Sequence, residues 1–302
     1  WGSKEAIEQG GVDALGEIYR RFYEEADKDP SLNDEAREAF AAMEAGDEES
    51  IRLWQWFKDL SLAEFKRTYA LLDLDFDSWA GESFYNDKMS AVIDELKEKG
   101  LLTESDGAMV VDLSEEKMPP CIILKSDGST IYATRDITAA IYRHNTYHFD
   151  KCIYVTDAGQ SLHFRQWFAV IGKMGYDWAD KLIHVPYGKL SINGARLASR
   201  TGNVILLRDL FADAIERVKQ ITLERNPSLE DIDAVARAVG VGAVVFHQLS
   251  TSKIKDISFD PEEALNFDGN TGPYVQYTYA RTQSVLEKAN LPLSAPETAL
   301  SF

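Results

Sequence analysis

The chain has 302 residues, a formal net charge of -18 at pH 7 and a hydrophobic fraction of 45%. This apolar content can fill real cores, which excludes a wholly disordered chain, and the length predicts two or three domains. The acidic balance argues against a general nucleic-acid binder, because phosphates are bound by Lys and Arg. A local basic strip would still allow an RNA partner.

No membrane segment is expected, because no apolar run approaches the ~20 residues that a membrane helix needs. The chain opens with Trp1-Gly2-Ser3 and charged residues, without a leader or an initiator Met. We therefore expect a fragment with a cytoplasmic location and no membrane partner. Cys121 and Cys152 each lie beside a β-branched apolar run without a neighbouring His, which predicts buried free thiols and no structural metal.

The first 100 residues are predicted to be mainly helical. Apolar residues recur at helical spacing in three stretches, 14–23, 34–43 and 50–69. A further helix is expected from 86 to 99, closed by Gly100.

From about residue 107 the pattern changes to strands alternating with helices. Strands are predicted at 108–113, 121–125, 130–134, 152–156 and 182–185. Asp127-Gly128 is expected to form a turn, and helices are expected from Asp136 to 143 and from 161 to 174. This alternation predicts an α/β fold with a parallel sheet, half of a doubly wound domain, whose ligands bind where the strands end. Helices follow at 207–222 and 232–249.

Two clusters lie where predicted strands meet helices. In Tyr132-Ala-Thr-Arg-Asp136, the Asp136 carboxylate can cap a helix and face the crevice, although a cap alone explains it equally well. In the stretch from Asp157 to Gln166, Gly159 allows close backbone approach, while Gln160 and His163 offer neutral hydrogen-bonding groups. A lone His on such a helix is more often a core residue, but its place beside Gln160 favours a site.

Two further clusters follow in the second half of the chain. Asn193-Gly194 predicts a tight hairpin, followed by a loop rich in Arg, Ser, Thr and Gly that suits a polyphosphate or is simply solvated. Further on, Pro273 is expected in the first turn of a helix. Tyr274, Tyr277 and Arg281 share one face of that helix, which suits either a core or an RNA surface.

Taken in order, these clusters resemble the class I arginyl-tRNA synthetases over nearly the whole chain. Gly81-Glu-Ser-Phe-Tyr85 and Val241-Gly-Ala-Val-Val-Phe246 add to the resemblance, and its most specific parts are 132–136 and 268–281. It implies an arginine–tRNA ligase, which activates arginine with ATP, accompanied by Mg²⁺, and transfers it to an arginine tRNA rather than acting on DNA.

The resemblance also implies a division of the chain. A mainly helical insertion with a short β element would occupy 1–120, and the second half of a Rossmann-like sheet 121–205. A helical stem-contact region would occupy 206–265, and the start of the anticodon-binding domain 266–302.

Residue roles follow from the same resemblance. Arginine would be held by Tyr132, Asp136 and Gln160, since a carboxylate can pair with a planar guanidinium. The implied ATP contacts are Gly159, His163, His184, Val185, Tyr187 and Gly188. The implied phosphate-stabilising residues are Arg196, Ser199 and Arg200. The implied tRNA contacts are Tyr274, Tyr277 and Arg281.

The sequence departs from the family pattern in three places. The stretch Arg196-Leu-Ala-Ser-Arg200 stands where the family has Lys-Met-Ser-Lys-Ser, and Tyr279 stands where relatives usually have His. The His-Ile-Gly-His signature does not occur in the 302 residues, and the resemblance places it upstream of Trp1. We therefore expect this chain to be inactive by itself. A non-catalytic remnant that binds arginine or RNA is one alternative. A class I synthetase for another amino acid is a second, and Asp136 argues against it because a carboxylate in the side-chain pocket suits a cationic substrate.

Overall fold

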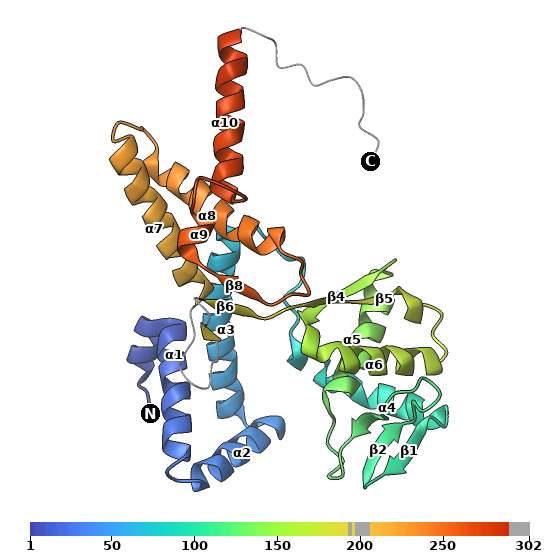
Figure 1. Ribbon diagram of the computed structural model, residues 1–302. Helices are drawn as coiled ribbons and strands as arrows, with labels where there is room; N and C mark the ends of the chain where they lie inside the picture. Colours follow the sequence, from blue (N-terminus) through green and yellow to red (C-terminus); the bar gives the residue numbers. More distant parts are fainter. Residues whose placement is uncertain (193–194, 197–205, 290–302) are drawn as a thin grey trace. The chain divides into compact units, whose positions relative to one another are not determined.

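The computed structural model describes residues 1–192, 195–196 and 206–289 (Figure 1). The chain folds as two compact units. The first unit comprises Trp1–Asp75, Leu190–Thr251 and Ser258–Phe302, and the second comprises Phe76–Lys189 and Ser252–Ile257. Each unit has a hydrophobic core of its own. The four-part division expected from the resemblance places its boundaries elsewhere and stays a prediction.

The first unit begins with a helical segment, as predicted. Its helices are α1 (Lys4–Ala26), α2 (Ser31–Glu44) and α3 (Glu48–Leu71). The Ser3 hydroxyl accepts a hydrogen bond from the backbone N–H of Ala6 and caps α1, while the Asp47 carboxylate accepts one from Ser50 and caps α3. These side chains satisfy N–H groups that have no partner within the helix.

The rest of the first unit is a small sheet followed by helices. In the sheet, β6 (Leu190–Ile192) lies between β7 (Ala195–Arg196) and β8 (Ile257–Phe259). Strands β6 and β7 pair antiparallel, Ser191 with Arg196 and Ile192 with Ala195. The predicted turn residues Asn193-Gly194 lie outside the described residues. The helices are α7 (Leu207–Arg225), α8 (Ile232–Ser250), α9 (Pro261–Ala264) and α10 (Gly272–Ala289).

Helix α8 packs against α7 on one side and α10 on another. Both crossings are close because they use glycine. A Cβ on Gly240 would lie 2.9 Å from the Ile215 backbone, and one on Gly272 would lie 2.7 Å from the Gly242 carbonyl oxygen.

The expectation that no segment is long and apolar enough to cross a membrane is wrong for helix α8. Its 19 residues have a mean hydropathy of 1.3, so among the described residues this one helix meets both requirements by length and composition. The expectation overlooked it because Asp233 and Arg237 interrupt the apolar run. A single such helix is weak evidence for a membrane, since core helices have the same composition, and Ala236, Ala243 and Val244 are buried in the core of this unit.

The second unit carries two sheets. It begins with η1 (Glu82–Lys88) and α4 (Met89–Glu98), followed by the antiparallel strands β1 (Leu102–Ser105), β2 (Ala108–Val111) and β3 (Cys121–Leu124). Next come α5 (Tyr132–Tyr147), β4 (Cys152–Asp157), η2 (Ala158–Gln160), α6 (Ser161–Lys173), η3 (Ala179–Lys181) and β5 (Leu182–Tyr187). Strands β4 and β5 pair in parallel from Cys152 with Leu182 to Asp157 with Tyr187.

The parallel pair and the helix that connects it were predicted, and the structure confirms both. Strand β3 does not extend this parallel pair, because it pairs with β2 in an antiparallel arrangement. Among the described residues, the parallel strands are therefore β4 and β5. Trp167 and Ile171 of α6 and Ile123 of β3 are fully buried in the core of this unit.

The strand predicted at 130–134 is wrong. Thr130 forms a single bridge with Leu124, and helix α5 already begins at Tyr132. Local β propensity favoured a strand, but packing decided otherwise: Thr134 and Ile137 are buried at helical spacing, and the Thr134 hydroxyl donates to the Ile123 carbonyl oxygen. Asp136 therefore lies in the second turn of α5 and does not cap it.

Both cysteines are free, as predicted. Cys121 is buried, and burial raises the pKa of its thiol to about 12. This thiol stays protonated at physiological pH and acts as a small apolar residue. Cys152 is only partly buried.

Candidate active site at the carboxyl ends of β4 and β5

Asp136 and His163 form the centre of the candidate site in the second unit. The His163 Nε2 atom lies 2.6 Å from the Asp136 Oδ2 atom, which joins the second turn of α5 to the first turn of α6. Both side chains are partly open to solvent, with exposed fractions of 36% for Asp136 and 31% for His163. The pair therefore lies at a surface that a ligand can reach.

Tyr132 lies one turn before Asp136 on the same face of α5, because residues four apart in a helix are neighbours. Its side chain is 67% exposed, whereas Ala133 and Thr134 beside it are buried in the core. The same helix thus turns one face to the core and presents the phenol and carboxylate to solvent.

The turn after β4 brings two more predicted residues to this region. The Asp157 carboxylate accepts a hydrogen bond of 2.8 Å from the backbone N–H of Gly159 and caps η2. A Cβ on Gly159 would lie 2.8 Å from that carboxylate, so a side chain there would crowd the turn. Gly159 and Gln160 are exposed, and η2 leads directly into the helix that carries His163.

His184 is engaged with its neighbours on β4 and α6. Its Nε2 atom lies 2.9 Å from the Thr156 hydroxyl, and its ring stacks on Phe164 with centroids 4.4 Å apart and an interplanar angle of 8°. Burial lowers the pKa of His184, so the ring is neutral at pH 7. Val185 follows on the other face of β5, since strand side chains alternate. The geometry gives His184 a supporting role at the strand end.

Gly188 lies where the chain leaves β5. A Cβ at this position would lie 2.2 Å from the Lys255 carbonyl oxygen, so a side chain would collide with backbone. The Gly188 N–H donates to the Lys253 carbonyl oxygen at 2.7 Å, and the Lys189 N–H donates to Asp256 at 2.8 Å. These contacts dock the segment Ser252–Ile257 against the end of β5, next to the 44% exposed Tyr187.

Sequence reasoning missed two supports of this site. The docked segment carries no recognisable motif, because Lys253-Ile-Lys-Asp256 has the composition of a solvated loop. The second is an ion pair of 2.7 Å between Glu82 and Arg135, the residue before Asp136. Glu82 lies in the stretch Gly81–Tyr85, which is part of the family resemblance, so the sequence did single out this stretch. Nothing in the sequence indicated that Glu82 pairs with Arg135.

A family model for the tRNA synthetases of class I (R), catalytic domain, matches residues 2–261. The chain belongs to this class I arginyl-tRNA synthetase family. The arginine–tRNA ligases of Alkaliphilus metalliredigens and Clostridioides difficile are 53% and 54% identical to this chain. The matches cover 97% and 98% of the chain but 52% of each relative, so the chain spans about half the length of the curated relatives it matches.

Solved synthetase structures show the same fold. The arginyl-tRNA synthetase of Plasmodium falciparum superimposes with a TM-score of 0.74 at 30% identity, covering 87% of this chain and 45% of that one. The synthetase of Thermus thermophilus gives a TM-score of 0.79 at 24% identity, covering 100% of this chain and 55% of that one. The likeness to the Thermus protein bears on the fold alone.

The remaining site candidates of this family member belong to the first unit. Arg196 lies on β7, where its backbone pairs with Ser191, whereas Ser199 and Arg200 lie outside the described residues. Tyr274 and Tyr277 on α10 are 43% and 49% exposed, so they form a surface and not a core. The Arg281 guanidinium donates to the Tyr277 hydroxyl at 3.1 Å.

In the part of the chain that the structure describes, no three His, Cys, Asp or Glu side chains gather as ligands for a metal ion. Asp157, the carboxylate at the end of β4, already caps the following turn. The described residues therefore do not fit a metal ion that the protein itself holds.

Proposed function

We propose that the protein containing this chain is an arginine–tRNA ligase. The carboxylate of arginine attacks the α-phosphate of ATP, pyrophosphate leaves, and the adenylate then passes arginine to the terminal ribose of an arginine tRNA with release of AMP. No residue becomes covalently linked to the substrate, so the protein acts by positioning and by stabilising charge. Family membership supports the reaction, and the partly exposed Asp136 carboxylate beside Tyr132 supports arginine as its substrate.

Asp136 is the proposed partner of the substrate guanidinium. His163 contacts its Oδ2 atom, which leaves Oδ1 to accept from the ligand and limits rotation of the carboxylate. Tyr132 offers a phenol on the same face of α5, and Gln160 an amide at the end of η2. A charged hydrogen-bonded pair of this kind favours arginine over neutral analogues.

ATP is proposed to bind beside the arginine site at Asp136, at the carboxyl ends of β4 and β5. This is the usual ligand position in parallel α/β sheets. The exposed backbone of Gly159 and the strand end at Val185 and Tyr187 would contact the nucleotide. His184 and Gly188 would hold that strand end in place. Mg²⁺ would arrive on the ATP phosphates, whose charge it neutralises.

The proposed roles of Arg196, Ser199 and Arg200 are contacts to the polyphosphate. If Arg200 acts on the transition state, Arg200→Ala will lower the rate of adenylate formation more than it weakens ATP binding. Equal losses in pre-steady-state rate and in ATP affinity would assign it to binding alone. Tyr274, Tyr277 and Arg281 are proposed as contacts to the tRNA.

Aminoacylation of a transcribed arginine tRNA with labelled arginine tests this function, using the full-length protein that contains this chain. Arginine should be transferred, while citrulline, which replaces the guanidinium by an uncharged urea, should not. Arginine binding without AMP release would support the alternative, a remnant that binds its ligand without chemistry. Transfer of lysine in preference to arginine would refute the substrate assignment.

A further inference from the structure

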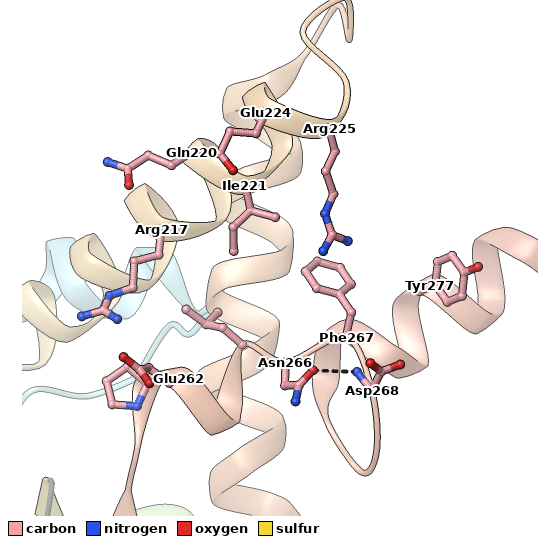
Figure 2. A pocket seen from close by; sticks show the side chains of 12 residues that line it. Arg217, Gln220, Ile221, Glu224, Arg225, Glu262, Asn266, Phe267, Asp268 and Tyr277 are labelled. Carbon is pink, nitrogen blue, oxygen red and sulfur yellow. Dashed lines mark hydrogen bonds between the residues drawn. The ribbon is translucent and has the colours of Figure 1, made fainter.

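Two hollows differ in their relation to the proposed function. The one in Figure 2 lies between α7, the α9 segment and α10, and Tyr277 lines it, so it is part of the tRNA surface proposed above. The other, of about 710 Å³, lies in the second unit, between helix α6 and the segment that connects β2 to β3. Its volume falls in the range of about 300–1,000 Å³ that is typical of ligand sites.

This α6 hollow lies on the far side of α6 from the candidate active site. Arg165 lines it, whereas His163, two residues earlier, contacts Asp136. Two residues correspond to roughly 200° of rotation in a helix with 3.6 residues per turn, so the two side chains leave α6 on opposite sides. Among the described residues, none of those proposed to bind arginine or ATP lines the hollow. An occupant would therefore not displace either substrate directly.

The segment between β2 and β3 forms one wall, and hydrogen bonds hold it in place. The Met118 N–H donates to the Leu113 carbonyl oxygen at 3.1 Å. From α6, the Gln166 amide donates to the carbonyl oxygens of Pro119 and Pro120 at 2.9 and 3.2 Å. A wall that is already fixed loses little conformational freedom when a partner binds.

Lys117 on this wall is held in a backbone conformation that lysine rarely adopts. Its φ is +56°, in the left-handed region that favours glycine. Such conformations persist where the surrounding structure fixes them, and they gather at ligand sites. The fold therefore keeps a cation on this wall in spite of the backbone strain.

Two cations flank the hollow without a carboxylate partner. Lys117 on the β2–β3 segment and Arg165 on α6 are both exposed, and neither forms an ion pair within the part of the chain that the structure describes. The Glu116 carboxylate beside them is paired with Lys173 at 3.1 Å. In a chain with a net charge of -18, two unpaired cations beside one hollow are complementary to an acidic partner.

The lining between the two cations is apolar. It includes Leu162, Met118 and Phe168, and Leu162 is 40% exposed. A large apolar side chain of a peptide would remove this surface from water, whereas a sugar–phosphate backbone would not. The Glu116 carboxylate in the lining also disfavours a run of phosphates, whose binding depends on excess Lys and Arg.

We propose that the α6 hollow binds a peptide segment of a partner protein, in which acidic side chains flank a large apolar one. The apolar side chain packs on Leu162 and Phe168, and the carboxylates pair with Lys117 and Arg165. Charge and apolar lining together specify this chemistry, since a basic peptide fits only the lining and a nucleic acid only the charge. The inference adds a docking surface outside the proposed arginine and ATP site.

Fluorescence anisotropy with a labelled octapeptide tests this inference on the full-length protein that contains this chain. The probe alternates Asp and Glu with Leu and Phe. One control peptide replaces the acidic residues by Asn and Gln, and the other replaces Leu and Phe by Ser. Each control should bind at least about 5-fold more weakly than the probe, because each lacks one of the two complementary features.

Lys117→Gly and Arg165→Gln remove the two charges. Glycine suits the left-handed conformation at residue 117, so this change should not harm folding. Each substitution should weaken binding of the probe about 2- to 5-fold, the value of an exposed ion pair, and the two together about 4- to 25-fold. Lys151→Gln is the matched control and should bind like the parent, since Lys151 is exposed in the same unit but does not line the hollow.

Reversal of both charges separates direct pairing from a general effect of charge. The double variant Lys117→Glu with Arg165→Glu should lose the probe and should bind a peptide with Lys in place of Asp and Glu more tightly than the parent does. Leu162→Ser should weaken binding of both peptides, because it removes part of the apolar lining. Aminoacylation by the double variant should stay at the level of the parent.

Binding of the probe that neither the charge reversal nor Leu162→Ser weakens would overturn the inference, and so would failure of the full-length protein to bind the probe. Displacement of the probe by an arginine tRNA, with equal loss of tRNA affinity in the double variant, would make the hollow a nucleic-acid contact instead. A dimer that the double variant dissociates, seen by light scattering, would assign the hollow to a second copy.

Discussion

Asp136 acquires its chemical setting from a residue 27 positions away. His163 contacts one carboxylate oxygen, and Arg135 next to Asp136 is held by Glu82. None of these residues identifies the site by itself. Their combination produces a carboxylate whose orientation is defined and which remains accessible to a cationic ligand.

Asp136→Asn should raise the KM for arginine about 10- to 150-fold in the full-length protein, with little change in the KM for ATP. The loss of a charge-assisted pair costs about 1.5–3 kcal/mol. Steady-state kinetics with each substrate varied in turn measure both constants. Asp150→Asn, at an exposed position of the same unit, is the control. Equal weakening of arginine and ATP would contradict the assignment.

His184 should make the stability of the chain depend on pH. Burial lowers the pKa of this residue, so the unfolded chain, with a pKa of about 6.5, binds the proton more readily than the folded chain. Stability should therefore fall as pH falls through 6.5 and level off below the folded pKa.

Urea unfolding of the parent and of His184→Gln between pH 8 and 5.5 measures this contribution. Gln keeps a hydrogen-bonding group near Thr156 but does not titrate. The parent should lose more stability over this range than the variant does. Identical pH profiles would show that His184 titrates equally in both states.

At the scale of elements, close backbone contacts hold the strand end of β5. Gly188 allows the segment Ser252–Ile257 to approach within hydrogen-bonding distance, and β8 begins directly at the end of that segment. Any side chain at residue 188 would separate the two backbones.

Gly188→Ala should destabilise the protein by about 1–3 kcal/mol or more, because the added carbon collides with the Lys255 carbonyl group. Gly16→Ala is the matched control: nothing lies within 4 Å of its added carbon, and alanine favours the interior of α1. Chemical denaturation measures both variants. A Gly188→Ala protein as stable as the parent would show that the strand end can move aside.

A second link between elements joins α1, α3 and α7. The Arg208 guanidinium contacts Asp13 at 2.5 Å, Asp209 at 3.0 Å and Glu64 at 3.2 Å. The hydrogen bonds that it donates to these carboxylates, that to Asp13 foremost, raise the pKa of Arg208. Glu64 is only 16% exposed, and Arg208 places an opposite charge beside it.

Arg208→Ala should lower the free energy of unfolding by about 1–2 kcal/mol, more than an isolated surface pair contributes. Arg37→Ala removes such an isolated pair on α2 and should change the free energy little. Thermal unfolding of the two variants provides the comparison. If both substitutions lower the free energy of unfolding equally, the Arg208 cluster contributes no more than an isolated surface ion pair.

At the scale of the whole molecule, the proposed functions divide between two units. Arginine and ATP candidates lie in the unit that contains β4 and β5, whereas Arg196 and the tRNA candidates on α10 belong to the other. The proposed phosphate contact at Arg196 therefore belongs to the same unit as the proposed tRNA contacts.

The 302-residue chain should show little arginine-dependent ATP–pyrophosphate exchange, even with tRNA present. Its sequence contains no His-x-Gly-His stretch, so a site built from these residues alone lacks groups that stabilise the transition state. The exchange assay should compare the chain with the full-length protein at equal concentration. Robust exchange by the chain would refute this placement of the catalytic groups.

The sequence by itself determined the α/β class, the helices before and after the parallel strands, and the strand–helix–strand unit of β4, α6 and β5. These depend on hydrophobic periodicity and turn residues, which act within a short window of the chain. The order of its motifs also indicated the arginyl-tRNA synthetase family.

Only the tertiary structure decided which side chains meet. The start of α5 at Tyr132, the pairing of Asp136 with His163 and the docking of Asp256 on Lys189 join residues up to 67 positions apart. The first two follow from the burial of Thr134, Ile137 and Trp167 in the core of this unit. The third follows from the close backbone approach at Gly188. Core packing overrides local propensity, so a pattern read along the chain could predict the elements but not the pairs of residues that they bring together.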